Sequence, residues 1–141
     1  KGLAWADVIF CSPELTEKTR GMLSYSTLKH VKQGAIFINI ARGEISPLED
    51  LKKMLDEEKI SALGLDVFSE EGVLAEDLRG HSQNLRETSR LILELKDKDN
   101  VIFTPHNAFN TEEALDRKAS LAVKSIKVFL KTGRFPWPVP K

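Results

Sequence analysis

The chain has 141 residues, which is enough for a domain with a sizeable core. Lys plus Arg and Asp plus Glu number 21 each, so the formal net charge is zero, and no electrostatic attraction to nucleic acid or to an acidic membrane is expected. The hydrophobic fraction of 41% is typical of a globular protein, and no apolar run approaches the ~20 residues of a membrane span. Cys11 is the only cysteine, which excludes an internal disulfide and indicates a reducing, cytoplasmic location.

The first residues look like the middle of an element rather than the start of a protein. The chain begins with Lys1 instead of Met, and Leu3, Ala4 and Trp5 resemble a helix end that runs into a strand. We therefore expect that sequence is missing upstream of Lys1.

Four short apolar segments are predicted to be strands. They are Ala6–Phe10, Ala35–Ile40, Ile60–Val67 and Val101–Thr104. Apolar side chains on both faces are typical of buried parallel strands. Gly64 lies inside the third segment, which predicts a close approach by a neighbouring backbone or a ligand.

The first predicted helices lie between these strands. Ser24 is expected to cap a short helix that turns Leu28 and Val31 inward. The segment Ser46–Glu49 predicts a capping box, with serine at the N-cap, proline at N1 and glutamate at N3. Ser69–Gln83 is polar and is predicted to be a long connection with one helical turn.

Two more helices are predicted in the second half of the chain. One spans Asn84–Leu95, and a long one starts at Thr111 and ends at Gly133. Helical spacing in the long helix predicts a buried stripe formed by Leu115, Ala119, Ala122, Ile126 and Phe129. The proline-rich tail that follows is expected to be extended.

Strands that alternate with helices predict a parallel α/β sheet, in which right-handed crossovers bring all strand carboxyl ends to one edge. Ligands of such sheets bind outside that edge. The polar residues expected there are Ser12 with Pro13, Arg42, Asp66 with Glu70 and Glu71, and His106. Although they are far apart in sequence, we expect these residues to lie close together in space.

An arginine, an acid and a histidine at one sheet edge can perform proton-transfer chemistry on a carboxylic acid. Arg42 can hold a carboxylate, and His106 can give or take a proton. Each residue also has a structural alternative. Arg42 could pair with a surface acid, His106 could bind a backbone carbonyl or a helix end, and Asp66 could only anchor the following loop. Glu70 and Glu71 could be solvated loop charges. No metal site is predicted.

Five segments resemble the C-terminal part of the NAD-dependent D-isomer-specific 2-hydroxyacid dehydrogenases. They are ADVIF-CSP, LTEKTRGML, KQGAIFINIARGE, ISALGLDVFSEE and NVIFTPHNAFNTEEA. Together they cover the chain from Ala6 to about residue 130, and the loop before Gln83 with the HNAFNT run is most similar to the D-lactate dehydrogenase branch. The resemblance implies a Rossmann-like parallel sheet with helices on both faces.

The resemblance also implies roles for individual residues. Arg42 matches the substrate-binding arginine, Glu71 the glutamate that supports the histidine, and His106 the proton donor and acceptor, with Glu70 as a competitor of Glu71 one residue away. The residues that match contacts to the cofactor NAD are Ser12, Pro13, Ile40, Ala41 and Asp66. The substrate implied is a small 2-keto or D-2-hydroxy acid.

The chain departs from the family in what it lacks. None of its eight glycines forms the G-x-G-x-x-G loop that cradles the cofactor's phosphates, and the separate substrate domain is absent. We expect residues 1–110 to be the second half of an NAD-binding domain, and residues 111–141 to be a C-terminal helix and tail. The isolated chain should bind NAD weakly and have little or no turnover.

Two further expectations follow from a half-domain. A central strand would be uncovered, which predicts self-association into a homo-oligomer such as a dimer. The same fold is also similar to transcriptional corepressors that sense NAD, so a non-catalytic sensor or a scaffold module is the alternative to an enzyme segment.

Overall fold

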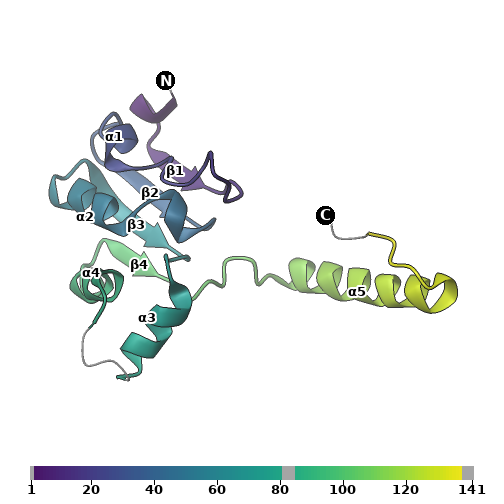
Figure 1. Ribbon diagram of the computed structural model, residues 1–141. Helices are drawn as coiled ribbons and strands as arrows, with labels where there is room; N and C mark the ends of the chain where they lie inside the picture. The colour runs from purple at the N-terminus through teal and green to yellow at the C-terminus, as the bar shows by residue number, and fades with distance from the viewer. Residues whose placement is uncertain (1, 81–84, 138–141) are drawn as a thin grey trace. The chain divides into compact units, whose positions relative to one another are not determined.

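The computed structural model describes residues 2–80 and 85–137, and the chain divides into two compact units, residues 1–106 and 107–141. The elements in chain order are η1 (Gly2–Ala4), β1 (Val8–Cys11), α1 (Tyr25–Leu28), β2 (Ala35–Asn39), η2 (Gly43–Ile45), α2 (Leu48–Asp56), β3 (Ile60–Leu65), α3 (Glu71–Leu78), α4 (Glu87–Leu95), β4 (Val101–Phe103) and α5 (Glu112–Thr132). Figure 1 shows their arrangement along the chain.

The first unit is built on a parallel sheet with the strand order β1-β2-β3-β4 (Figure 1). Helical segments carry the chain back between successive strands, as parallel pairing requires. The strand boundaries lie within two residues of those predicted from the apolar runs. The predicted parallel α/β sheet is therefore confirmed, and all four strand carboxyl ends share one edge.

One face of the sheet forms the core together with α1, α2 and α4. Phe37 from β2 and Leu63 from β3 are opposite each other in the register, and both are buried. Leu28, Leu51 and Leu95, one from each helix, are fully buried in the same apolar cluster. Burial of these side chains contributes on the order of 2 kcal/mol each. The inward orientation predicted for Leu28 is confirmed.

The opposite face of the sheet carries exposed apolar side chains. Val8, Phe10, Ile36 and Ile102 are between 38% and 66% exposed. Of the two helical layers expected, the described residues of the first unit form one. The side chains on the open face are those that a second layer would cover.

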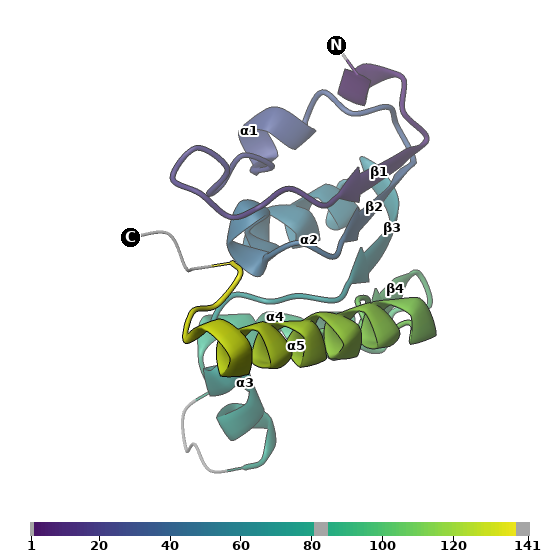
Figure 2. The same cartoon turned by 90° about the vertical axis from the view of Figure 1, so that its right-hand side faces the viewer.

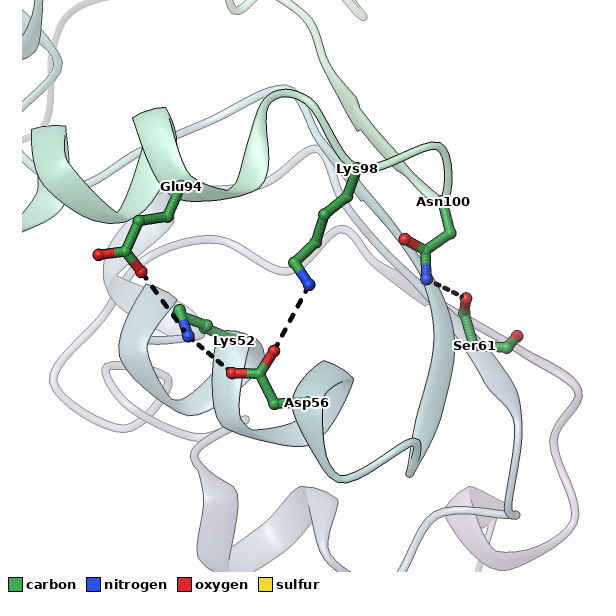
Figure 3. A network of polar contacts seen from close by, with 6 residues as sticks. All are labelled: Lys52, Asp56, Ser61, Glu94, Lys98 and Asn100. Atoms are coloured by element: carbon green, nitrogen blue, oxygen red, sulfur yellow. Dashed lines mark hydrogen bonds and ion pairs between the residues drawn. The ribbon is translucent and has the colours of Figure 1, made fainter.

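A polar network joins α2 to α4 and to the turn before β4. Figure 3 shows the Lys52 ammonium on α2 between the Asp56 carboxylate at 2.6 Å and the Glu94 carboxylate of α4 at 3.7 Å. Lys98, in the turn before β4, lies 3.7 Å from Asp56. The hydrogen bond to Lys52 lowers the pKa of Asp56. The network therefore ties α2 to α4 on the side of the layer that faces solvent.

The capping box predicted at Ser46 is wrong. Helix α2 starts at Leu48 with Pro47 at the N-cap, and no side chain caps it. The Ser46 hydroxyl instead accepts a hydrogen bond from the Asn39 amide at 2.7 Å. Ser24 does occupy an N-cap, at α1, but its hydroxyl bonds Ser26 and not the helix backbone.

The polar segment after β3 is more helical than its sequence predicts. Eight residues from Glu71 to Leu78 form α3, where one turn was expected. Its N-cap residue, Glu70, has a left-handed backbone with φ 57° and makes no side-chain cap. The next helix, predicted from Asn84, begins at Glu87, while residue 84 lies outside the described residues.

The second unit contains α5, a continuous helix of 21 residues (Figures 1 and 2). Both predicted ends are confirmed, because the Thr111 hydroxyl accepts from the Ala114 amide and Gly133 is left-handed with φ 71°. The predicted burial of its apolar stripe is wrong. No residue of α5 is buried, and Ile126 is 55% exposed. Among the described helices, none is long and apolar enough to cross a membrane.

Candidate active site at the carboxyl edge of the sheet

The turn that carries Arg42 is organised by a buried asparagine at the end of β2. Asn39 is fully buried, and its Nδ2 donates to the Arg42 carbonyl at 3.0 Å and to the Ser46 hydroxyl at 2.7 Å. Its Oδ1 accepts from the Ala41 amide at 2.8 Å. One side chain thus satisfies polar groups on both sides of Arg42, so the turn leaves the strand in a fixed direction.

The Arg42 side chain is exposed at this edge. Its Nη1 donates to the Ala41 carbonyl at 2.6 Å, and among the described residues no carboxylate lies within ion-pair distance of its guanidinium. Among the described residues, Arg42 therefore does not form the ion pair with a surface acid that was the structural alternative. The guanidinium can take a ligand carboxylate in two parallel hydrogen bonds.

Glu71 and His106 form a hydrogen-bonded pair beyond the ends of β3 and β4. His106 Nδ1 lies 2.8 Å from Glu71 Oε2, and the two side chains are 36% and 38% exposed. The other oxygen, Oε1, accepts from the Phe68 amide at 3.1 Å, which fixes the carboxylate. The carboxylate that faces the imidazole is thus that of Glu71, not of Glu70. An imidazole oriented in this way can exchange a proton with a ligand.

A close backbone contact joins the Arg42 turn to the segment that leads into Glu71. A Cβ added to Gly43 would lie 2.2 Å from both the Phe68 carbonyl carbon and the Ser69 nitrogen. Only glycine permits this approach. The close backbone approach predicted at Gly64 is absent, since a Cβ there would meet the Ile38 side chain at an ordinary 3.6 Å. The ligand alternative at Gly64 stays a prediction. The sheet edge therefore holds the Arg42 turn against the segment that leads into Glu71, whose carboxylate faces His106.

Asp66 is 3% exposed and connects the ends of β3 and β4. Its Oδ1 accepts from the Thr104 hydroxyl at 2.6 Å, and its own amide donates to the Asn39 carbonyl at 3.0 Å. These contacts correspond to the anchoring role that the sequence left open. The hydrogen bond to Asp66 also holds Thr104, two residues before His106. The backbone of His106 itself is left-handed, with φ 52°.

A cavity of about 450 Å³ adjoins the Glu71–His106 pair. Both members of the pair line it, together with the apolar side chains Phe68, Leu74 and Phe103. The Phe68 and Phe103 rings meet edge to face with their centroids 5.4 Å apart, which stiffens this wall. The space beside the imidazole is therefore apolar and large enough for a small organic acid.

The residues predicted to contact the cofactor lie after β1 and β2. Ser12 is exposed and Pro13 is half-buried directly after the end of β1. The Ile40 amide donates to the Cys11 carbonyl at 3.2 Å, and the Ala41 amide is held by Asn39. Because both amides are engaged within the protein, the groups that a ligand would meet here are carbonyls and side chains.

Residues 1–108 match the family model of the D-isomer specific 2-hydroxyacid dehydrogenase, NAD binding domain. The chain belongs to this family. It is 33% identical, over 93% of its length, to the D-lactate dehydrogenase of Lactiplantibacillus plantarum, and 34% identical, also over 93%, to the glyoxylate reductase of Pyrococcus furiosus. The crystal structure of D-lactate dehydrogenase from Aquifex aeolicus, complexed with NAD and lactic acid, aligns with 97% of the chain at 34% identity and a TM-score of 0.80.

The chain spans only part of these dehydrogenases. It covers 39% of the Lactiplantibacillus plantarum protein, 34% of the Pyrococcus furiosus protein and 43% of the Aquifex aeolicus chain. The fold class, a Rossmann-like parallel sheet that represents part of the dehydrogenase, is therefore confirmed.

The chemistry of this edge fits one part of a dinucleotide. Exposed Ser12, and the carbonyls that follow β2, offer hydrogen-bonding groups beside the Arg42 turn, where a polar ligand end could rest. A pyrophosphate requires backbone amides on a glycine-rich turn, and none of the glycines in this sequence forms such a motif. The residues present can therefore contact a polar part of a dinucleotide, but they do not form a cradle for its phosphates.

Two residues that shape the site do not figure among the predicted site residues. They are Asn39, which organises the Arg42 turn, and Gly43, which allows it to touch the Phe68–Ser69 backbone. The sequence does contain a signal for the first. A polar amide inside an otherwise apolar strand segment must find hydrogen-bond partners when it is buried.

Proposed function

We propose that this chain supplies the acid–base and carboxylate-binding groups of an NAD-linked oxidoreductase that interconverts 2-keto acids and D-2-hydroxy acids. The observation that supports it best is the His106–Glu71 contact of 2.8 Å, at the sheet edge that also carries Arg42. Family membership supports the same reaction class.

The proposed chemistry assigns one task to each side chain. Arg42 binds the substrate carboxylate, which places the adjacent carbonyl beside the imidazole. His106 donates the proton on Nε2 to the carbonyl oxygen during reduction, and takes it back during oxidation. Glu71 accepts from Nδ1 and stabilises the imidazolium. When bound, the nicotinamide supplies the hydride that the carbonyl carbon receives.

By itself, the 141-residue chain should turn over slowly or not at all. No residue in it matches the phosphate-cradling loop, so the cofactor would be held at one end only. We propose that NAD is the cofactor of the complete enzyme, since the chain belongs to a family of NAD binding domains. Because the phosphate-cradling loop is missing from this sequence, we expect the chain alone to bind NAD weakly.

The test is a chimera. This chain replaces the matching region of the Lactiplantibacillus plantarum D-lactate dehydrogenase, which supplies the remaining segments. The chimera should reduce small 2-keto acids with NADH, while the isolated chain should not. His106→Asn should lower kcat by at least about a hundredfold, because the proton donor is lost. His30→Asn is the matched control, since His30 is an exposed histidine in the turn after α1.

Three outcomes would count against the proposal. Robust turnover by the pure chain would overturn the expected inactivity. A folded chimera that binds NADH without turnover would instead favour the non-catalytic sensor. Turnover that is insensitive to His106→Asn would favour a scaffold whose site does not take part in catalysis.

We also propose that the chain self-associates through its open sheet face and the β1 edge. Phe10 is 57% exposed on that face, and β1 ends the sheet with one pairing edge free of other strands of the unit. Phe10→Lys should shift the sedimentation of the chain toward a monomer, whereas Ile126→Lys on α5 should do so only if copies exchange that helix. A clean monomer of the unaltered chain at high concentration would contradict the proposal.

A further inference from the structure

We propose that Asn39 is a positioning residue for Arg42, so that substrate binding depends on a buried amide that never touches the substrate. The inference rests on the proposed function, because it concerns the arginine assigned to the substrate carboxylate. The Asn39 side chain bonds the Ala41 amide, the Arg42 carbonyl and the Ser46 hydroxyl, so its loss should act on substrate binding through the Arg42 turn.

The geometry of the amide is specific to the turn. Oδ1 accepts from the peptide N–H of Ala41, one residue before Arg42, at 2.8 Å. Nδ2 donates at 3.0 Å to the carbonyl of Arg42 itself. One rigid amide plane thus holds the N–H of the Ile40–Ala41 peptide group and the carbonyl of the Arg42–Gly43 peptide group. The direction of the arginine follows from that plane.

The same position accepts few other side chains. Asn39 is fully buried, so a group without partners there would lose the full cost of desolvation. An aspartate could still accept from the Ala41 amide, but its second oxygen would face the Arg42 carbonyl and the Ser46 hydroxyl without a proton to donate to the carbonyl. A leucine would satisfy none of the three groups.

The turn is also held from its other side. Gly43 rests against the Phe68–Ser69 backbone, and the Phe68 amide donates to Glu71. Arg42 therefore sits between two fixed points, the Asn39 amide and the Gly43 contact. Loss of the amide frees the first point, so the guanidinium should swing relative to His106 while the sheet stays folded.

The first experiment uses the full 141-residue chain and needs no activity. In Asn39→Ala, hydrogen exchange of the Ala41 amide should speed up at least about tenfold relative to the amides of β3, since its acceptor is removed. The matched control is Asn100→Ala, which removes an amide-to-carbonyl hydrogen bond of 2.8 Å to Ser61 at the amino edge of the sheet. An unchanged Ala41 amide in folded Asn39→Ala would overturn the inference.

The second experiment is a double-mutant cycle in the chimera. Asn39→Ala should lower kcat/KM for pyruvate about tenfold, mainly through a higher KM, when Arg42 is present. In the Arg42→Ala background it should change kcat/KM less than about twofold. Equal losses in both backgrounds would show a general folding role and refute the positioning role.

The two experiments separate the two proposals. If the unaltered chimera has no turnover, the proposed function fails, and the exchange of the Ala41 amide still decides whether Asn39 orders the turn. Asn39→Asp serves where Asn39→Ala fails to fold, because it keeps an acceptor for Ala41. Its exchange should remain slow, while its KM should rise.

Discussion

Replacing Gly43 with alanine tests the contact that brings the Arg42 turn against the loop after β3. The new Cβ would lie 2.2 Å from two backbone atoms, the Phe68 carbonyl carbon and the Ser69 nitrogen, where ordinary contacts begin near 3.4 Å. One backbone segment must therefore move by more than 1 Å. Overpacking of this kind costs about 1–3 kcal/mol, and we expect the upper part of that range because neither contact atom belongs to a flexible side chain.

The assay is urea unfolding of the chain followed by far-UV circular dichroism, with Gly64→Ala as the matched control. Gly64 also lies in the sheet unit, but an added Cβ would meet only the Ile38 side chain at 3.6 Å. The control should change the free energy of unfolding by less than about 1 kcal/mol. Equal stability of the two variants would refute the reasoning, because it would mean that the turn and the loop are not in contact.

Two other predictions concern single ionisable groups. The pKa of Asp56 is lowered by its hydrogen bond to Lys52. The stabilisation is therefore present at neutral pH and is lost as the pH falls from the ordinary aspartate pKa, about 4, toward the lowered pKa of the folded state. Asp56→Asn should therefore lower the free energy of unfolding at pH 7 by about 0.5 kcal/mol, a small value because the ion pair is partly exposed. The variant's free energy of unfolding should also fall less between pH 7 and acidic pH. The same pH dependence in the variant and the unaltered chain would contradict this. Cys11 is 2% exposed, and burial raises the pKa of its thiol. Alkylation of Cys11 at pH 8 should therefore be slow in the folded chain and fast in urea. Fast alkylation of the folded chain would show that the end of β1 is open to solvent.

The sheet could be predicted because its signal is local. Each strand is a short apolar run, and the alternation with helices leaves a parallel arrangement as the simple solution. The order of the polar residues along the edge then follows from topology. Arg42 and His106 could be placed at one edge from the sequence, because each comes directly after a strand.

The errors arose where a distant contact outweighs a local preference. Ser46 has the sequence context of a helix cap, but a buried amide seven residues earlier takes its hydroxyl. Helix α3 starts without a side-chain cap in a polar segment, and the carboxylate of its first residue, Glu71, is held by Phe68 and His106. Periodicity identified the apolar stripe of α5, but it cannot state what covers such a stripe.

The backbone of His106 lies in the left-handed region, with φ 52°, which costs an L-residue about 1 kcal/mol. A glycine there would adopt the same conformation freely. The fold thus loses some stability in order to hold the His106 imidazole against Glu71. Selection for thermal stability alone would therefore favour glycine at this position. Such a selection should yield a variant that is more stable to heat but lacks the proton donor.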